Sequence, residues 1–315
     1  MTEFKQNLPV SIVIPTCNRA DLIGRSIKSV LSQTFQDFEI IVVDDASDDN
    51  TEDVVKSFDE NRIRYLRHEK RKGASAARNT GIRVSTGRFI AFLDSDDEWF
   101  PYKLEKQVNK ISACSDKVGV IYGGHAAVSE KTGEVFDSRI PAARGNVRKH
   151  ALRYALLGAG SVSLIRKSCF ERVGLFDESL QSLEDWDLYI RLSKYYEFDF
   201  VPEILIRRYM HAQQTTTTLQ GKIQARSAII QKHFNDLVKY PSIFADHLNR
   251  LGIVYALAGD LTQARKCFWR SIKKSPVQRF AYINLLPLFF CPQAYTNVLE
   301  RDIARKSIDG VPVYW

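Results

Sequence analysis

The chain is poor in cysteine and has no long apolar run, and each shortage argues against a class of protein. Its five cysteines are scattered through 315 residues and form no Cys-x-x-Cys pair. This argues against a disulfide framework or a thiolate zinc site and suits a reducing compartment. The first residues, MTEFKQNLPVSIVIP, have no basic region before a short apolar run, so we expect no signal peptide. No stretch reaches the ~18 apolar residues of a membrane span. We therefore expect a cytoplasmic protein, with peripheral attachment at the inner face of the cell membrane as a further option.

Glycine-rich phosphate loops are also missing. The first β-rich apolar run, VSIVI at 10–14, is followed by PTCNRAD instead of Gly-x-Gly-x-x-Gly, and no Walker A sequence occurs. This disfavours a dinucleotide dehydrogenase and a P-loop nucleotide hydrolase. A phosphate group bound here would need a cation in place of a glycine-rich cradle.

What is present is an alternation of apolar strands and helical patterns. Continuous apolar runs predict buried strands, with helical spacing between them, at 10–14, 38–43, 63–68 and 89–93. Pro15 is expected to end the first strand, and Asp97 to cap a helix over EWFPYKLEKQV. The alternation predicts a largely parallel α/β sheet covered on both faces.

Polar residues follow three of these strands. In open α/β sheets, ligands bind outside the carboxyl ends of the strands, so these polar groups should meet at one edge. Turn and capping roles are the alternative for each of them taken singly. The residues are Thr16, Asn18 and Arg19 after the first strand, Asp44, Asp45 and Ser47 after the second, and Asp94 and Asp96 after the last.

The acidic run DSDDE after FIAFL suggests a metal. Asp94 and Asp96 are two positions apart, which in extended backbone places both side chains on one face. Carboxylate oxygens are the ligands that Mg²⁺ and Mn²⁺ prefer. A divalent cation with a bound sugar nucleotide would offset the repulsion between these carboxylates.

Five motifs in order resemble the successive motifs of family 2 glycosyltransferases with the GT-A fold. The similarity covers roughly residues 8–212 and rests on VSIVIPTCNR, IIVVDDAS, RKGASAARNTGI, FIAFLDSDD and EDWDLYIRL. The resemblance implies the GT-A nucleotide-diphospho-sugar transferase fold, a mostly parallel mixed sheet, with Mn²⁺ or Mg²⁺ as cofactor.

The resemblance also implies where the donor binds. Asp44 would receive the base, as the matching aspartate does in relatives that use UDP-sugars, and Asp96 would bind the metal beside Asp94 of the DXD motif. His211, in RRYMHAQQT, would reach the metal or the diphosphate; a plain loop histidine is the alternative. The implied nucleotide-sugar residues are Pro15, Thr16, Asn18, Arg19, Asp44, Asp45, Ser47, Lys72, Gly73, Arg78, Asn79, Asp94, Ser95 and Asp96.

For the reaction itself, the resemblance points to EDWDLYIRL. Asp185 would be the general base that takes the proton of an acceptor hydroxyl, in a single displacement that inverts the sugar, with Glu184 beside it. Capping of a helix N-terminus is the alternative for both acids. Gly160, Ser161 and Trp186 would lie on the acceptor side. Because no QxxRW motif occurs, one sugar per encounter is expected.

The end of the chain differs from the rest. Residues 1–214 hold 31 basic and 31 acidic residues, whereas 215–315 hold 14 and 6, so the tail carries the whole formal charge of +8. We therefore predict a catalytic domain over 1–214, with a donor half at about 8–100 and an acceptor half at about 101–214, followed by a basic α-helical tail.

Within this tail, one segment has the spacing of a single tetratricopeptide-like unit, at about 245–278. Leu251, Gly252, Tyr255, Ala264 and Phe268 match the repeat, and Gly259-Asp260 would form the turn between its helices. The run FAYINLLPLFF after it is too short to span a bilayer. It suits either a membrane interface or a buried terminal helix.

Taken together, the sequence predicts a metal-dependent, inverting glycosyltransferase of surface polysaccharide biosynthesis. It would use a nucleotide-diphospho-sugar donor, with UDP-sugar favoured, and a glycan or lipid-linked acceptor. The basic tail would meet a protein partner or an anionic membrane surface, or form a solvated face, and no nucleic acid is expected. The alternatives are a nucleotidyltransferase of similar architecture and a non-catalytic scaffold that binds partners through the tail.

Overall fold

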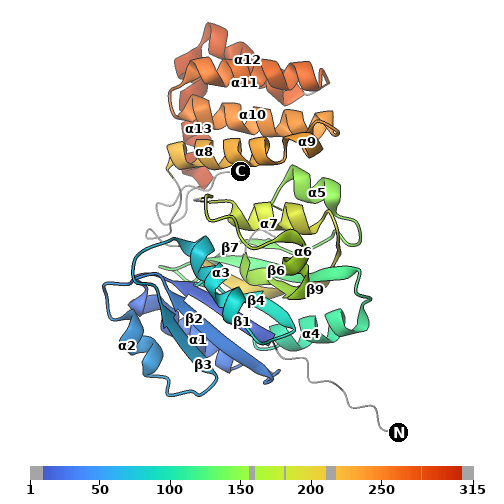
Figure 1. Ribbon diagram of the computed structural model, residues 1–315. Helices are drawn as coiled ribbons and strands as arrows, with labels where there is room; N and C mark the ends of the chain where they lie inside the picture. Colours follow the sequence, from blue (N-terminus) through green and yellow to red (C-terminus); the bar gives the residue numbers. More distant parts are fainter. Residues whose placement is uncertain (1–9, 156–159, 181, 211–217, 278, 307–315) are drawn as a thin grey trace. The chain divides into compact units, whose positions relative to one another are not determined.

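The computed structural model describes residues 10–155, 160–180, 182–210, 218–277 and 279–306, and it consists of two compact units (Figure 1). The described residues within 10–148, 160–179 and 184–209 form the first unit. Those within 149–155, 180–183 and 210–306 form the second. The predicted site residues that the structure describes lie in the first unit.

The first unit is an α/β domain that begins with four strands and three helices in alternation. These are β1 (Val10–Thr16), α1 (Ala20–Leu31), β2 (Phe38–Asp44), α2 (Thr51–Lys56), β3 (Ile63–Arg67), α3 (Ala74–Val84) and β4 (Phe89–Phe92). It continues with β5 (Glu98–Trp99), α4 (Lys103–Ala113), β6 (Val118–Ser129), β7 (Val135–Arg139), η1 (Gly160–Val162), β8 (Ser163–Arg166), α6 (Ser168–Val173), α7 (Glu184–Leu192) and β9 (Glu197–Met210).

These strands form one mixed sheet of order β3-β2-β1-β4-β8-β6-β9-β5, with β7 paired to β6. The four predicted strands pair in parallel, and β8, β6 and β7 continue the sheet in antiparallel pairs. In the parallel half, Thr16 of β1 lies opposite Asp44 of β2, and Val13 lies opposite Phe92 of β4. The carboxyl ends of three strands therefore end side by side, as the sequence predicted.

Alternate residues of the central strands face opposite layers of helices. Ile40 and Val42 belong to the apolar core that includes Ile27 of α1, whereas Ile41 and Val43 pack with Ala77 of α3. All are buried, which explains why the strands read as unbroken apolar runs. The parallel strands are thus covered on both faces.

Two local predictions were wrong. β1 continues through Pro15, whereas its pairing with β4 has already ended at Val13 and Phe92. The missing proline N–H therefore breaks no ladder bond. Glu98–Trp99 is not helical but pairs with β9, and helix α4 begins at Lys103, after Pro101, whose ring disfavours a helical Phe100.

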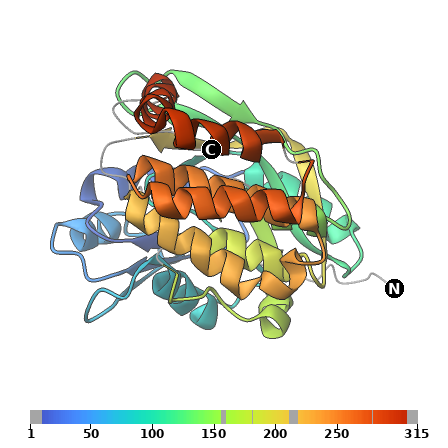
Figure 2. The same cartoon turned by 90° about the horizontal axis from the view of Figure 1, so that it is seen from above.

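The second unit is helical. Its elements are α5 (Arg148–Arg153), α8 (Leu219–Lys232), α9 (Phe234–Leu237), α10 (Pro241–Leu257), α11 (Leu261–Lys274), α12 (Arg279–Phe290) and α13 (Pro292–Lys306). Figure 2 shows its helices, coloured orange to red, lying alongside one another. The buried His247 of α10 bonds through Nε2 to Leu152 O at 2.7 Å, which ties α5 into this unit. No described helix has the length and apolarity to cross a membrane.

Helices α10 and α11 occupy the segment with the predicted repeat spacing, and their membership of the tetratricopeptide class stays a prediction. Gly259, at φ +81°, makes the turn between them. Gly252 of α10 faces the buried ring of Phe268 of α11, and a Cβ at position 252 would stand 2.6 Å from that ring. Glycine is therefore needed for the close approach of the two helices.

This approach predicts opposite effects for the same substitution in two helices. Gly252→Ala should lower the stability of the helical unit by about 1–3 kcal/mol, because its methyl overpacks against Phe268. Gly24→Ala in α1 should raise stability by about 0.5–1 kcal/mol, because a Cβ there meets Val54 at an ordinary 3.8 Å and alanine favours helix. Calorimetric unfolding of both full-length variants tests this. Equal shifts of one sign would contradict it.

Candidate active site

The loop after β2 is held by the carboxylate of Asp44, which is fully buried. Its Oδ1 accepts the Ser47 N–H at 2.8 Å and its Oδ2 accepts the Tyr65 hydroxyl at 2.6 Å. Ser47 Oγ in turn accepts the Asn18 N–H at 2.8 Å, which joins the loops after β1 and β2. Asn18 has φ +52°, a conformation that asparagine tolerates better than most residues. Asp44 therefore organises this loop, and its expected contact with a base stays a prediction.

Asp45 organises a different loop, the one between β3 and α3. Its carboxylate bonds to His68 Nδ1 at 2.7 Å and accepts the N–H groups of Lys72 and Gly73 at 2.8 and 2.7 Å. Burial opposes the charge on Asp45, but these hydrogen bonds outweigh it and lower the pKa of the carboxyl. The exposed Lys72 and Gly73 are thereby positioned at the rim of the site.

Arg78 joins the two halves of the first unit. From α3, its guanidinium donates to Asp94 Oδ1 at 2.7 Å and to Glu184 Oε1 at 2.8 Å, and its side chain is 6% exposed. Burial alone would lower the pKa of Arg78, but the carboxylates of Asp94, Asp185 and Glu184 raise it well above its ordinary value. A charged arginine thus stands between the end of β4 and the start of α7.

Asn79, the next residue, has a structural contact. Its amide nitrogen donates to Phe176 O and Glu178 Oε1, and its Oδ1 accepts the Phe176 N–H. It is 1% exposed. Asn79 therefore holds the loop before α7 in place through these hydrogen bonds.

Asp185 lies in the first turn of α7, beside Glu184. Its Oδ1 is buried and has no hydrogen-bond partner among the described residues. Burial raises the pKa of the carboxyl to about 7, with Glu184 and Asp94 also raising it and Arg78 and the Gly160 N–H opposing them. A Cβ at Gly160 would stand 3.0 Å from Asp185 Oδ2, so only glycine leaves this carboxylate uncrowded. A carboxylate with a pKa near neutrality and an unused oxygen is equipped to accept a proton.

The four-residue turn Asp94–Asp97 follows β4 and is closed by a bond from the Asp97 N–H to Asp94 O. Arg25 of α1 donates to Asp96 O at 2.9 Å, and Ser26 donates to Asp97 O at 2.7 Å. Because the carboxyl ends of β1 and β4 are adjacent, helix α1, which follows β1, can donate these two hydrogen bonds to the turn.

Asp97, in the same turn, was predicted to cap a helix. This prediction was wrong, because the next helix begins only at Lys103. Asp97 is 3% exposed and accepts the Ser161 hydroxyl at 2.7 Å. Burial, together with the nearby Asp96 and Asp94, raises its pKa well above the ordinary value, although Arg208 opposes the shift. This shift favours the neutral form of the Asp97 carboxyl beside Asp94 and Asp96.

Ser161 connects the turn to the segment that adjoins Asp185. Its Oγ also accepts the Asp94 N–H at 3.1 Å, and its carbonyl accepts Trp99 Nε1 at 3.1 Å. Ser161 is fully buried, and Trp186 is 3% exposed. Ser161 and Trp186 are thus two buried members of the three residues expected on the acceptor side, and their place beside an acceptor stays a prediction.

The metal ligands can be placed only in part. Asp94 and Asp96 lie partly exposed at the end of β4, and His211 lies outside the described residues. Among the described residues, no group of three or more histidine, cysteine or acidic side chains is arranged as a metal cluster. Two hard carboxylates fit Mn²⁺ or Mg²⁺ if diphosphate oxygens and waters complete the shell.

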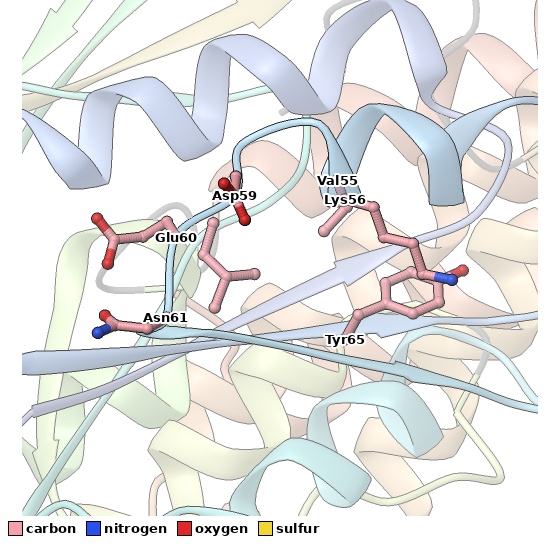
Figure 3. A pocket seen from close by; sticks show the side chains of 7 residues that line it. Val55, Lys56, Asp59, Glu60, Asn61 and Tyr65 are labelled. Carbon is pink, nitrogen blue, oxygen red and sulfur yellow. The ribbon is translucent and has the colours of Figure 1, made fainter.

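A pocket of about 310 Å³ lies apart from these groups, between α2 and β3 (Figure 3). Its lining includes Tyr65, whose hydroxyl bonds to Asp44, but none of the predicted site residues. The other lining residues are Val55, Lys56, Asp59, Glu60, Asn61 and Ile63. The candidate site is therefore the open edge at the strand ends.

Comparison with known proteins identifies the family. The model of "Glycosyl transferase family 2" matches residues 11–175, just over half of the chain. The chain is a family 2 glycosyltransferase. This glycosyltransferase is 33% identical over 228 residues to an uncharacterised glycosyltransferase of Rickettsia prowazekii, covering 70% of this chain and 71% of the other.

A second relative has a named activity. The glycosyltransferase is 42% identical over 123 residues to the UDP-Glc:alpha-D-GlcNAc-diphosphoundecaprenol beta-1,3-glucosyltransferase WfgD of Escherichia coli, covering 39% of this chain and 48% of WfgD. The family assignment removes the nucleotidyltransferase alternative.

Solved structures show the same fold. TarS of S. aureus in complex with UDP-GlcNAc gives a TM-score of 0.67 at 16% identity, covering 96% of this chain and 95% of that one. A mannosyltransferase of Pyrobaculum calidifontis in complex with GDP-Man and Mn²⁺ gives 0.57 at 18% identity, covering 94% and 85%. The glycosyltransferase thus has the GT-A fold, followed by C-terminal helices.

The bonds of Ser161 predict a role in positioning the acidic turn. Ser161→Ala would leave the buried Asp97 carboxyl and Asp94 N–H without this partner, at a cost of about 1–3 kcal/mol for such a group. We expect transfer to need a higher Mn²⁺ concentration for half-maximal rate, by about tenfold. Ser85→Ala is the matched control, because the buried Ser85 hydroxyl bonds only three residues back, to Ile82 O. Unchanged metal dependence in Ser161→Ala would rule out the role.

Proposed function

We propose that this glycosyltransferase moves one sugar from a nucleotide-diphospho-sugar to a hydroxyl group of a lipid-linked glycan, with inversion and with a divalent cation. The observation that carries the proposal is the Asp185 carboxylate, with a buried unpartnered oxygen and a pKa raised to about 7. A donor of the UDP-sugar type is supported by WfgD, named for UDP-Glc, and by TarS, solved with UDP-GlcNAc. The diphosphoundecaprenol in the name of WfgD supports a lipid-linked acceptor.

The chemistry follows from the positions of the acidic groups. Asp185 takes the proton of the acceptor hydroxyl as its oxygen bonds to the anomeric carbon, and the bond from that carbon to the diphosphate breaks. A single displacement of this kind inverts the anomeric centre. Arg78 pairs with both Asp94 and Glu184 and offsets part of their negative charge, which favours a further carboxylate at Asp185.

A bound Mn²⁺ or Mg²⁺ would be held by Asp96 and Asp94 and would stabilise negative charge on the departing diphosphate. Support comes from the carboxylate donor set and from the Mn²⁺ bound to the structurally similar mannosyltransferase. Lys72 and Gly73 at the rim, and Asn18 and Arg19 after β1, are proposed to contact the nucleotide. The catalytic domain is proposed to end near the start of the basic tail.

The metal assignment predicts the behaviour of Asp96→Ala. Without that carboxylate the cation loses a ligand, so transfer should be lost and binding of UDP in the presence of Mn²⁺ should weaken at least about tenfold. Titration calorimetry with UDP, with Mn²⁺ and with EDTA, separates the metal-dependent part of binding. Asp116→Ala, at an acid that is 90% exposed, is the control. Full activity of Asp96→Ala, or of the wild type in EDTA, would contradict the assignment of Asp96 as a ligand of a required metal.

The base assignment predicts the behaviour of Asp185→Asn. Asparagine keeps the size of the side chain but cannot take the proton, so kcat should fall by about 10²–10⁴-fold while donor affinity stays nearly unchanged. A base must be ionised to act. The kcat/KM of the wild type should therefore rise with pH up to about 7 and level off above it, and the variant should lose this rise.

Single-turnover transfer and calorimetric donor affinity are the two measurements. Glu184→Gln is the comparison variant, because Glu184 pairs with Arg78 and its loss should cost less rate than the loss of Asp185. If Asp185 only caps helix α7, asparagine should substitute well and the rate should barely change. That result would refute the mechanism.

A further inference from the structure

Helix α12 exposes an apolar face to solvent. Phe280, Ile283, Leu286 and Phe290 recur at three- and four-residue spacing, and with Phe289 they are 55–80% exposed. The opposite side of α12, including Ala281, Leu285 and Leu288, is buried in the core of the second unit. The helix is thus apolar around its circumference, a pattern that normally belongs to a helix covered on all sides.

Helix α11 adds aromatic and basic groups beside this face. In Figure 1, α12 ends the stack of α8, α10 and α11. Trp269 of α11 is 54% exposed, and the Arg265 guanidinium lies 5.2 Å from the Phe289 ring. Between Leu261 and Cys291 there is no acidic residue and there are six basic ones, namely Arg265, Lys266, Arg270, Lys273, Lys274 and Arg279.

We propose that α12 and the adjoining basic residues of α11 form a docking surface for an anionic phospholipid membrane. The surface combines large exposed aliphatic and aromatic side chains with unopposed positive charge, which is the composition of helices that lie in the membrane interface. Twelve residues of helix extend about 18 Å, well short of the ~30 Å hydrocarbon core, so α12 would lie in the plane of the interface.

Charge decides between this occupant and a second copy of the chain. A twofold contact through the α12 face would bring the basic residues beside that face in one copy toward those of the other, with no acid between Leu261 and Cys291 to offset them. An anionic bilayer offers the opposite charge, and long lysine and arginine side chains can reach its headgroups while the apolar side chains insert.

This surface deepens the proposed function, since an enzyme that rests on it would meet a lipid-linked acceptor in the same membrane. That consequence rests on the proposed function, but membrane binding itself does not. The two are measured separately, because vesicle binding needs no donor, acceptor or metal. An enzyme that binds vesicles yet transfers no sugar would contradict the proposed function alone.

The test is co-sedimentation of the full-length protein with phosphatidylcholine vesicles that contain or lack phosphatidylglycerol, at low and high salt. We expect binding to the phosphatidylglycerol vesicles that weakens as salt screens the charges. Replacing Phe280, Ile283, Leu286 and Phe290 together by serine should weaken it at least about tenfold, without unfolding, because all four side chains are exposed. The control replaces the exposed apolar Val135, Phe136, Ile140 and Tyr154, which lie outside α11 and α12, by serine and should bind normally.

A second pair of variants tests how much the positive charge of α11 contributes to vesicle binding. Lys266→Gln with Arg270→Gln and Lys273→Gln should weaken binding at least about tenfold and flatten its salt dependence. The same change at the exposed Lys28, Lys117 and Lys131 of the first unit should have little effect.

Two outcomes of the vesicle experiment would overturn the proposal. One is wild-type protein that does not bind phosphatidylglycerol vesicles. The other is equal binding by the serine variant and its control. Sedimentation velocity without vesicles gives the competing answer: a dimer that the serine variant abolishes would assign the face to a second copy.

Discussion

The buried guanidinium of Arg78 is the contact on which the rest of the site depends. It pairs with Asp94 at the end of β4 and with Glu184 at the start of α7, residues that come from opposite halves of the catalytic unit. Without the arginine, the partly exposed carboxylates of Asp94 and Glu184 would lose this ion-pair partner. The charge of Arg78 therefore stabilises the neighbouring carboxylates of Asp94, Glu184 and Asp185.

The second constraint is the segment Gly160-Ser161, which touches both chemical centres. The absence of a side chain at Gly160 leaves room for the Asp185 carboxylate, and the Ser161 hydroxyl holds the turn that carries Asp94 and Asp96. The positions of the proposed base and of the proposed metal ligands therefore both depend on this short stretch of backbone. A shift of that stretch would move Asp185 and the turn that carries Asp94 and Asp96 together.

The helical unit is stabilised by contacts of its own. It has its own core, built around the contact between Gly252 and Phe268, and it leaves α12 apolar on the side that faces solvent. Such a face together with a run of basic residues suits the apolar, anionic neighbour that we propose. A transferase whose acceptor is carried by a lipid would have that neighbour at hand.

The sequence alone determined what depends on local pattern. Apolar runs gave the four parallel strands, and the position of polar residues after them gave the open edge with Asp44, Asp94 and Asp96. Five motifs together indicated the family, because their order and spacing are shared along the chain. The glycine turn and small residues of 245–278 indicated the helix pair of the second unit.

Only the tertiary structure decided what these residues bond to. Asp97 looked like a helix cap but lies buried against Ser161, 64 positions away. Asn79 bonds to Phe176, 97 positions away, and its expected place along the donor stays a prediction. Arg78 finds Glu184 across 106 positions. Sequence pattern reports neighbours within a turn or along a strand, whereas these partners meet only because the sheet brings distant segments to the same edge. The family resemblance had already indicated Asp185 as the base, and the structure adds that burial raises its pKa to about 7.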